Sequence, residues 1–80
     1  MLPEHAFYFH IMDAQGNGIQ HVSLEGIYMD GHRRLLPAVY TDNQGKAIIE
    51  SFSNLLIGLF IDGQQVDERF YPGQLYGFQK

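Results

Sequence analysis

The four histidines of this 80-residue chain are its residues best suited to bind a metal ion or transfer a proton. They are His5, His10, His21 and His32, and no two have the close spacing that places two ligands side by side on one strand or helix. If the strands that carry His10 and His21 form a local hairpin, the two side chains are diagonal neighbours. Glu25 is then the only nearby candidate for a third ligand. We therefore expect that the histidines are incidental and bind no metal ion, and that the protein has no cofactor.

The aspartates are spread over separate turn sequences. Asp13, Asp30, Asp42 and Asp62 each lie in a turn sequence that contains glycine, where a carboxylate can accept hydrogen bonds from the backbone of its own turn. Calcium requires six to eight oxygen ligands, and each turn offers a single carboxylate. The serines show no nucleophile-elbow motif and no accompanying His–Asp pattern. These patterns predict structural turns and give no support for a calcium site or a serine hydrolase.

Composition narrows the class of partner. The net charge is −4 with five Lys and Arg, so the chain lacks the basic surface that nucleic acids and anionic membranes attract. The longest apolar run, residues 55–61, is too short to span a bilayer, which predicts no membrane insertion. The N-terminal residues do not resemble a signal peptide. We expect a cytoplasmic protein or a domain excised from a longer chain, and the compartment stays open.

Short apolar runs separated by polar turns predict an all-β domain. No segment shows a sustained helical stripe, and the spacing is typical of a sandwich. Six or seven strands are expected, at residues 6–12, 19–28, 35–41, 46–51, 55–61, 64–70 and, as a short addition, 75–79. Residues 1–80 then form one domain with its core in 6–70, and 71–80 form a short strand or a docking tail.

Alternation along the strands predicts which side chains face inward. In the first strand, Phe7, Phe9 and Ile11 share one face. Pro37 cannot donate to a strand ladder, so the third strand lies at an edge or begins at this residue. Gly26 interrupts the second strand and indicates a bulge or a close approach of another chain segment.

Two turn sequences organise the chain. Tyr40–Glu50, built around Asp42-Asn-Gln-Gly45, predicts a strand–turn–strand unit at the centre of the molecule. Asp62-Gly63 is typical of a type I′ hairpin turn, which would place Leu59 opposite Val66 and Leu55 opposite Phe70. Local pairing alone also predicts that the first two strands form a hairpin, with Phe9 opposite Leu24.

Three segments together resemble the transthyretin-like (prealbumin-like) sandwiches, which include carboxypeptidase regulatory-like and related Ig-like domains. They are Ile11–Ile19 followed by Val22-Ser-Leu24, then Thr41–Ile48, then Leu59–Gly63. The likeness covers most of residues 7–70 and rests on turn motifs. It implies a Greek-key arrangement in which the first two strands lie in different sheets, contrary to the local hairpin. It also implies a binding or spacing role, as in domains that dock effectors on type VI secretion spikes or accompany surface proteins.

An enzyme also belongs to this group, the hydroxyisourate hydrolases. His10-Ile-Met-Asp13 resembles their N-terminal motif, and Lys46 stands where they carry an arginine after the central glycine. Their C-terminal Tyr-Arg-Gly-Ser motif and their second catalytic histidine have no counterpart in this chain. The resemblance therefore offers a divergent hydrolase that uses His10 and Lys46 as an alternative, while the main expectation is a protein without catalytic activity.

Aromatic residues exceed what a one-sided core of this size needs. Tyrosine is enriched at protein interfaces because it combines a large area with a polar tip. The candidate interaction residues are Tyr28, Tyr40, Phe70, Tyr71, Tyr76 and Phe78. Closure of the core is the competing explanation for the same residues. We expect a protein partner or a parent chain for this domain, with a homo-oligomer built from exposed edge strands as the alternative.

Overall fold

Residues 5–80 are described by the structure, a computed structural model, and they form strands without a helix. The eight strands are β1 His5–Met12, β2 Ser23–Met29, β3 Arg33–Leu35, β4 Val39–Tyr40, β5 Lys46–Ser51, β6 Gly58–Ile61, β7 Gln64–Val66 and β8 Leu75–Gln79. In this part of the chain, no helix is long and apolar enough to cross a membrane. The expectation about a signal peptide falls partly on residues 1–4, outside the described residues.

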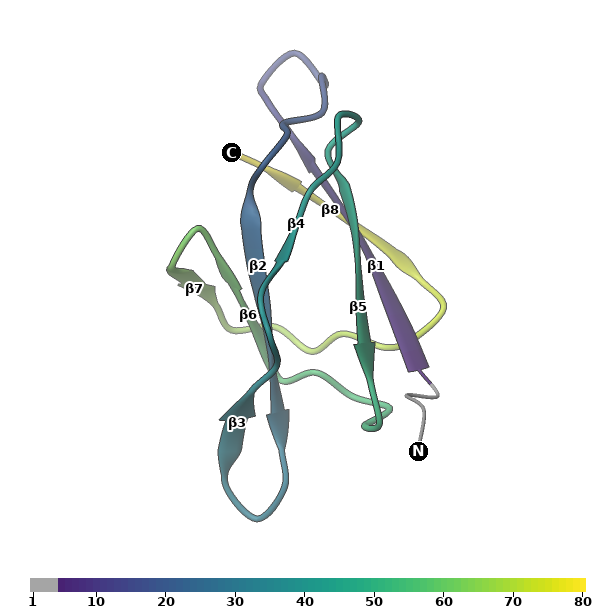
Figure 1. Cartoon of the computed structure of the whole chain (residues 1–80), viewed down its shortest axis with the longest axis vertical. Helices are drawn as coiled ribbons and strands as arrows, with labels where there is room; N and C mark the ends of the chain where they lie inside the picture. Colours follow the sequence, from purple (N-terminus) through teal and green to yellow (C-terminus); the bar gives the residue numbers. More distant parts are fainter. Residues whose placement is uncertain (1–4) are drawn as a thin grey trace.

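The strands form two sheets, which confirms an all-β, sandwich-like fold (Figure 1). Sheet A has the order β5-β1-β8, with β1 antiparallel to β5 and parallel to β8. Sheet B has the order β3-β2-β6-β7. The fifth strand, β4, pairs with Ser23 and Leu24 at the start of β2, whereas β3 pairs with the end of β2. Because β1 and β2 belong to different sheets, the hairpin that pairs Phe9 with Leu24 is wrong. The turn between β1 and β2 carries the chain from one sheet to the other.

The core lies between the two sheets. Phe7, Phe9 and Ile11 of β1 are fully buried, which confirms the alternation read from the sequence. From the other sheet, Leu24 and Leu59 are also fully buried. All three of these strands, β1, β2 and β6, have neighbours on both sides in their sheets, so their apolar side chains are covered by flanking strands as well as by the opposite sheet.

The strand expected at residues 35–41 is divided in two. Its ends form β3 and β4, which both pair with β2, while Pro37 lies between them outside any strand. A proline has no N–H to donate, so the ladder stops there and resumes at Val39. This division accounts for the eighth strand beyond the six or seven predicted.

The unit Tyr40–Glu50 is not a hairpin within one sheet. β4 pairs with β2 of sheet B, whereas β5 pairs with β1 of sheet A. In Figure 1, β4 runs between β2 and β5. The tight turn is present as predicted, but its two arms separate into the two layers. The apolar residues on either side of it therefore contribute to opposite walls of the core.

The Asp62-Gly63 hairpin is confirmed in its first part. Both residues have positive φ, 49° and 82°, as a type I′ turn requires, and Leu59 lies opposite Val66. Further from the turn, Phe70 pairs with Leu56 instead of Leu55. Because side chains alternate along an extended chain, this shift of one residue turns Leu56 into the core and leaves Leu55 half-buried.

Two similar turns join the sheets at one end. In each, an aspartate, Asp13 or Asp42, accepts hydrogen bonds from N–H groups two and four residues further on. The glycine three residues after each aspartate, Gly16 or Gly45, has positive φ. The second turn also packs against the first through backbone alone, since a Cβ on Gly18 would overlap the carbonyl of Gln44. This close contact fixes the end of the molecule that carries His10 and Lys46.

Candidate functional site

A groove on the outer face of sheet A brings together residues from both predicted sites, Tyr40 of the interaction set and Lys46 of the hydrolase alternative. We call it the outer groove, with a volume of about 420 Å³. The side chains that define it are Tyr8, Tyr40, Ile48 and Leu75, with Asp42 and Lys46 among the other lining residues. Apolar groups from four strands therefore share a surface with one acidic and one basic group.

The outer groove follows from the pairing of the strands. Tyr8 lies opposite Ile48 on one side and opposite Leu75 on the other, so the three side chains form a row across sheet A. Exposed fractions are 39% for Tyr8, 50% for Ile48 and 62% for Leu75, and Tyr40 beside the row is 64% exposed. A continuous row of this kind differs from isolated surface apolar residues, which need no explanation.

The structure brings together the two residues of the predicted hydrolase site. His10 and Lys46 are directly opposite each other in the β1–β5 ladder, so their side chains project from the same face of sheet A. The His10 Nε2 lies 3.0 Å from the carbonyl oxygen of Gln44. A carbonyl only accepts, so Nε2 carries the proton and neutral His10 keeps its lone pair on Nδ1. One imidazole nitrogen is therefore used to hold the turn.

Asp42 lies beside this pair and is held ionised by its own turn. Its Oδ1 accepts hydrogen bonds from the N–H groups of Lys46 at 2.9 Å and Gln44 at 2.8 Å. These two bonds lower the pKa of Asp42 from its ordinary value of 3.8. Burial opposes them, while the positive charges of Lys46 and of the protonated form of His10 lower the pKa further. The carboxylate serves as an acceptor for the backbone and is poorly suited to act as an acid.

Substituting Asp42 by asparagine should lower the thermal unfolding midpoint at pH 7. A folded-state pKa below the ordinary value means that ionised Asp42 stabilises the fold above pH 3.8. This stabilisation disappears as the pH falls through the lowered pKa. The difference in midpoint between wild type and Asp42→Asn should therefore shrink from pH 7 to pH 3, as followed by circular dichroism. Glu68→Gln, in an exposed loop, is the matched control, and a difference that stayed constant with pH would contradict the assignment.

The predicted interaction residues divide between surface and core. Tyr40 and Tyr71 are exposed, whereas Tyr28, Tyr76 and Phe78 are half-buried against the core and Phe70 is buried in it. Phe70 contacts the rings of Phe9, Tyr76 and Phe78, with centroids 4.9–5.9 Å apart. Four of the six aromatic residues therefore close the core.

Ile48 and Leu75 of the outer groove were not predicted from the sequence. Alternation with the buried residues Ala47 and Ile49 does indicate that Ile48 faces outward.

The C-terminal segment also has a structural role. Residues 75–79 form β8 of sheet A, so the short strand is the better of the two descriptions offered for residues 71–80. The Tyr76 hydroxyl accepts a hydrogen bond from the N–H of Tyr71 at 2.9 Å, which fixes the turn before the strand. Lys80 forms an ion pair with Asp62 of the β6–β7 turn and thereby connects the two sheets.

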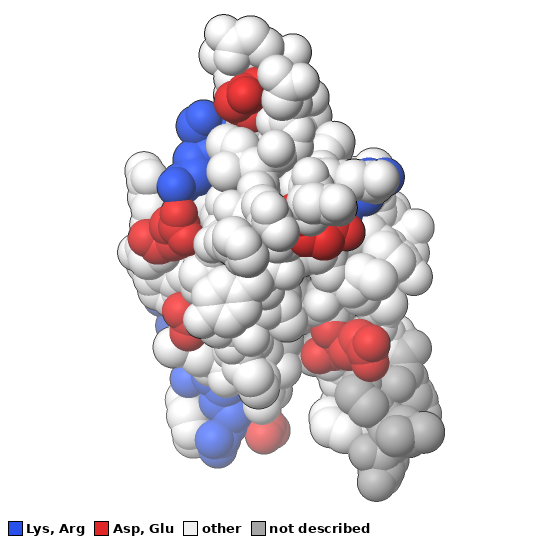
Figure 2. Space-filling model, turned by 45° about the horizontal axis from the view of Figure 1, so that its top comes forward, with Lys and Arg blue, Asp and Glu red and all other residues white. Residues whose placement is uncertain are grey.

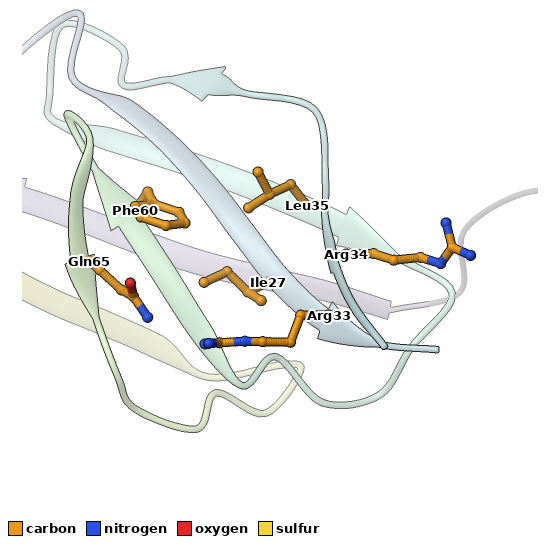
Figure 3. Close-up of a pocket in the computed structure, with 6 residues that line it drawn as sticks. All are labelled: Ile27, Arg33, Arg34, Leu35, Phe60 and Gln65. Atoms are coloured by element: carbon orange, nitrogen blue, oxygen red, sulfur yellow. The ribbon is translucent and has the colours of Figure 1, made fainter. Parts of the chain in front are cut away.

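A second, smaller hollow lies on the outer face of sheet B (Figure 3). Its volume is about 200 Å³, and Ile27, Leu35 and Phe60 gather in it while Arg34 points away. Ile27 is nearly fully buried although it faces away from the main core. Its neighbours already cover it, so this hollow is a small satellite of the core with Leu35 at its exposed rim.

Charge and histidine placement add no further site. Among residues 5–80, no group of three or more His, Asp or Glu side chains is positioned to hold a metal ion. His10 and His21 are not diagonal neighbours, because their segments do not pair. In Figure 2, Lys and Arg atoms form small separate groups interspersed with Asp and Glu, without a broad basic surface on this face.

Searches of family models, curated proteins and solved structures return no match to this chain.

Proposed function

We propose that this chain is a non-catalytic protein-interaction module with a transthyretin-like, Greek-key sandwich fold. The fold assignment is supported by the placement of β1 and β2 in different sheets and by the tight turns Asp13–Gly16 and Asp42–Gly45 that join the layers. The observation that carries the function is the row of Ile48, Tyr8 and Leu75 across sheet A. A core-forming sheet has no structural need for this row on its solvent face.

The partner is a protein segment that carries apolar side chains and a net positive charge. Apolar groups fit the row, and Tyr8 and Tyr40 add hydroxyls that can bond at the rim of an interface. The positive charge complements the net charge of −4 and speeds association with an acidic domain. This partner is a separate protein or the remainder of a parent chain that carries the domain.

A binding role agrees better with the geometry than the divergent hydrolase. The outer groove is open, so it does not exclude water from a reacting centre as a closed active site does. The Nε2 of His10 is engaged with a backbone carbonyl, and Asp42 is committed to its turn. The pairing of His10 with Lys46 is part of the backbone ladder between β1 and β5, and the two side chains add polar groups beside the groove.

Photo-crosslinking and a matched pair of substitutions test the proposal. A crosslinking residue placed at Ile48 identifies the partner, which is then purified and titrated by calorimetry. Ile48→Lys should weaken binding at least about tenfold, because it places a charge in the apolar row and opposes a basic partner. Leu35→Lys is the control, since Leu35 is similarly exposed at 57% but lies on sheet B, and it should change the affinity less than about twofold.

The two variants also define the contrary result. Equal loss of binding in Ile48→Lys and Leu35→Lys would point to a nonspecific effect of charge. Full binding by Ile48→Lys would remove the outer groove from the interface. Either result would overturn the proposal, provided that circular dichroism shows both variants folded.

A further inference from the structure

The free edge of β8 differs from the other sheet edges in the described residues. β5 carries Lys46 and Glu50, β3 carries Arg33 and Arg34, and β4 has only two residues. β7 has only three residues and is followed by Asp67-Glu-Arg69. β8 has the sequence Leu-Tyr-Gly-Phe-Gln, with neither a charge nor a proline. Charged residues, prolines and short lengths are the usual means of keeping edge strands unpaired, and β8 has none of them.

The ladder with β1 determines which backbone groups of β8 are free. The carbonyl of Gln74 accepts from Tyr8 N, and the N–H of Lys80 donates to Met12 O. Backbone groups alternate in direction along a strand, so the even-numbered residues of β8 bond to β1. The N–H and C=O groups of Leu75, Gly77 and Gln79 therefore point away from sheet A. They form a row of three free donor–acceptor pairs on an uncharged strand.

We infer that β8 pairs in antiparallel fashion with β8 of a second copy of this chain, about a two-fold axis at Gly77. This register places Gly77 opposite Gly77 and Leu75 opposite Gln79. Leu75, Gly77 and Gln79, whose backbone N–H and C=O groups are free in the single chain, become hydrogen-bonded pairs, with roughly six hydrogen bonds across the axis. The two sheets A join into one six-stranded sheet. The inference is independent of the proposed partner at the outer groove.

The side chains complement each other in this register. Tyr76 lies opposite Phe78 on the inner face in both halves, and both are half-buried in the single chain. Their pairs are of the non-hydrogen-bonded type, in which side chains approach most closely, and aromatic pairs there are favourable. Lys80 lies opposite Gln74, so no like charges meet. On the outer face, Gly77 brings no side chain of its own to the axis, and the Met12 side chain lies 3.2 Å from the place that a Cβ on Gly77 would take.

A groove beside the β8 edge gives a second reason for a partner. It has a volume of about 380 Å³ and lies between β8 and the β6–β7 hairpin, with Ile11, Ile61, Val66 and Phe78 as its apolar lining. Gln64, Gln79 and Lys80 form its polar rim. A second strand laid along β8 would cover this opening. The same surface thus offers unpaired backbone groups together with apolar area to bury, which are the two requirements of strand addition.

Charge substitutions across the two-fold axis test the register. Leu75→Lys with Gln79→Lys places like charges opposite each other in the dimer, and so does Leu75→Glu with Gln79→Glu. Leu75→Lys with Gln79→Glu places opposite charges there. Within one chain the two positions lie about 13 Å apart along the strand, so the three variants differ little as monomers. Glu50→Lys, at the other edge of sheet A, is the control.

Sedimentation equilibrium measures the outcome without any partner protein. Wild type and Glu50→Lys should dimerise with the same dissociation constant. Both like-charge variants should bind at least about tenfold more weakly, and the opposite-charge variant should stay within about threefold of wild type. A monomeric wild type at about 1 mM, at which even weak association is visible, would overturn the inference. So would a dimer that responds equally to all three variants, because it would use another surface.

Discussion

Gly45→Ala should unfold most of the protein at room temperature. Gly45 has a φ of +80°, which costs an alanine about 1–2 kcal/mol, and a Cβ there would overlap the backbone oxygen of Ile11. That oxygen accepts from Ile19 N at 2.9 Å, and Ile11 N donates to Gly45 O at 2.7 Å. If the two segments move apart to relieve this overlap, both hydrogen bonds break. We expect a loss of more than about 4 kcal/mol, close to the whole stability of a domain of this size.

Gly16→Ala is the matched control for this result. Gly16 occupies the equivalent position of the first turn, with a φ of +86°, but no atom lies within 4 Å of the place that an added Cβ would take. Only the cost of the left-handed conformation applies, about 1–2 kcal/mol. Urea denaturation followed by circular dichroism measures both variants. Equal losses would show that the contact between the two turns contributes nothing beyond backbone conformation.

Phe70→Ala should cost about 3–5 kcal/mol of unfolding free energy, because it removes the centre of an aromatic cluster and leaves a cavity. The side chain is 1% exposed and lies edge-to-face against Phe9 and Tyr76. Loss of these ring contacts adds to the loss of buried apolar area. The measurement is the same denaturation experiment, with tyrosine fluorescence as a second probe.

Phe52→Ala distinguishes this effect from a general intolerance of aromatic substitution. Phe52 is 58% exposed, so its removal should change the stability by less than about 0.5 kcal/mol. The comparison also decides between the two roles considered for Phe70. A stable Phe70→Ala protein that failed to bind its partner would restore Phe70 to an interface and contradict its place in the core.

Local chemistry made much of the fold predictable. Alternation identified Phe7, Phe9 and Ile11 as core residues, because each step along a strand reverses the side chain. The Asp62-Gly63 turn was predictable in position and in pairing near the turn, since few residues tolerate two successive positive φ angles. These features depend on a few neighbouring residues, and the sequence displays them directly.

The pairing of strands that lie far apart in the sequence was harder to predict. β1 finds its neighbours in β5 and β8, which lie far from it in sequence, and nothing local to Met12 or Leu24 shows that the intervening turn changes sheets. The turn motifs of a resembling family suggested this arrangement, whereas local pairing suggested the hairpin. The aromatic residues posed the same difficulty, because a ring has equal apolar area whether it closes a core or meets a partner.

The outer groove was only partly visible in the sequence. Tyr40 was named for its aromatic ring, and Lys46 for its place after the central glycine. Ile48 and Leu75 are aliphatic residues that become neighbours of Tyr8 only through the pairing of three strands. The proximity of His10 and Lys46 likewise depends on the β1–β5 register. Sites of this kind require the sheet order before their members can be recognised.

The contrast between the two ends of the molecule bears on how it can be engineered. The end where Gly18 meets Gln44 consists of backbone in contact with backbone, so an inserted peptide there would separate the layers. At the other end, the β2–β3 loop projects into solvent, and nothing lies within 4 Å of the side-chain position of Gly31 (Figure 1). An epitope, a fluorophore attachment site or a circular-permutation point belongs in that loop. There it would report on the domain without disturbing the groove or the β8 edge.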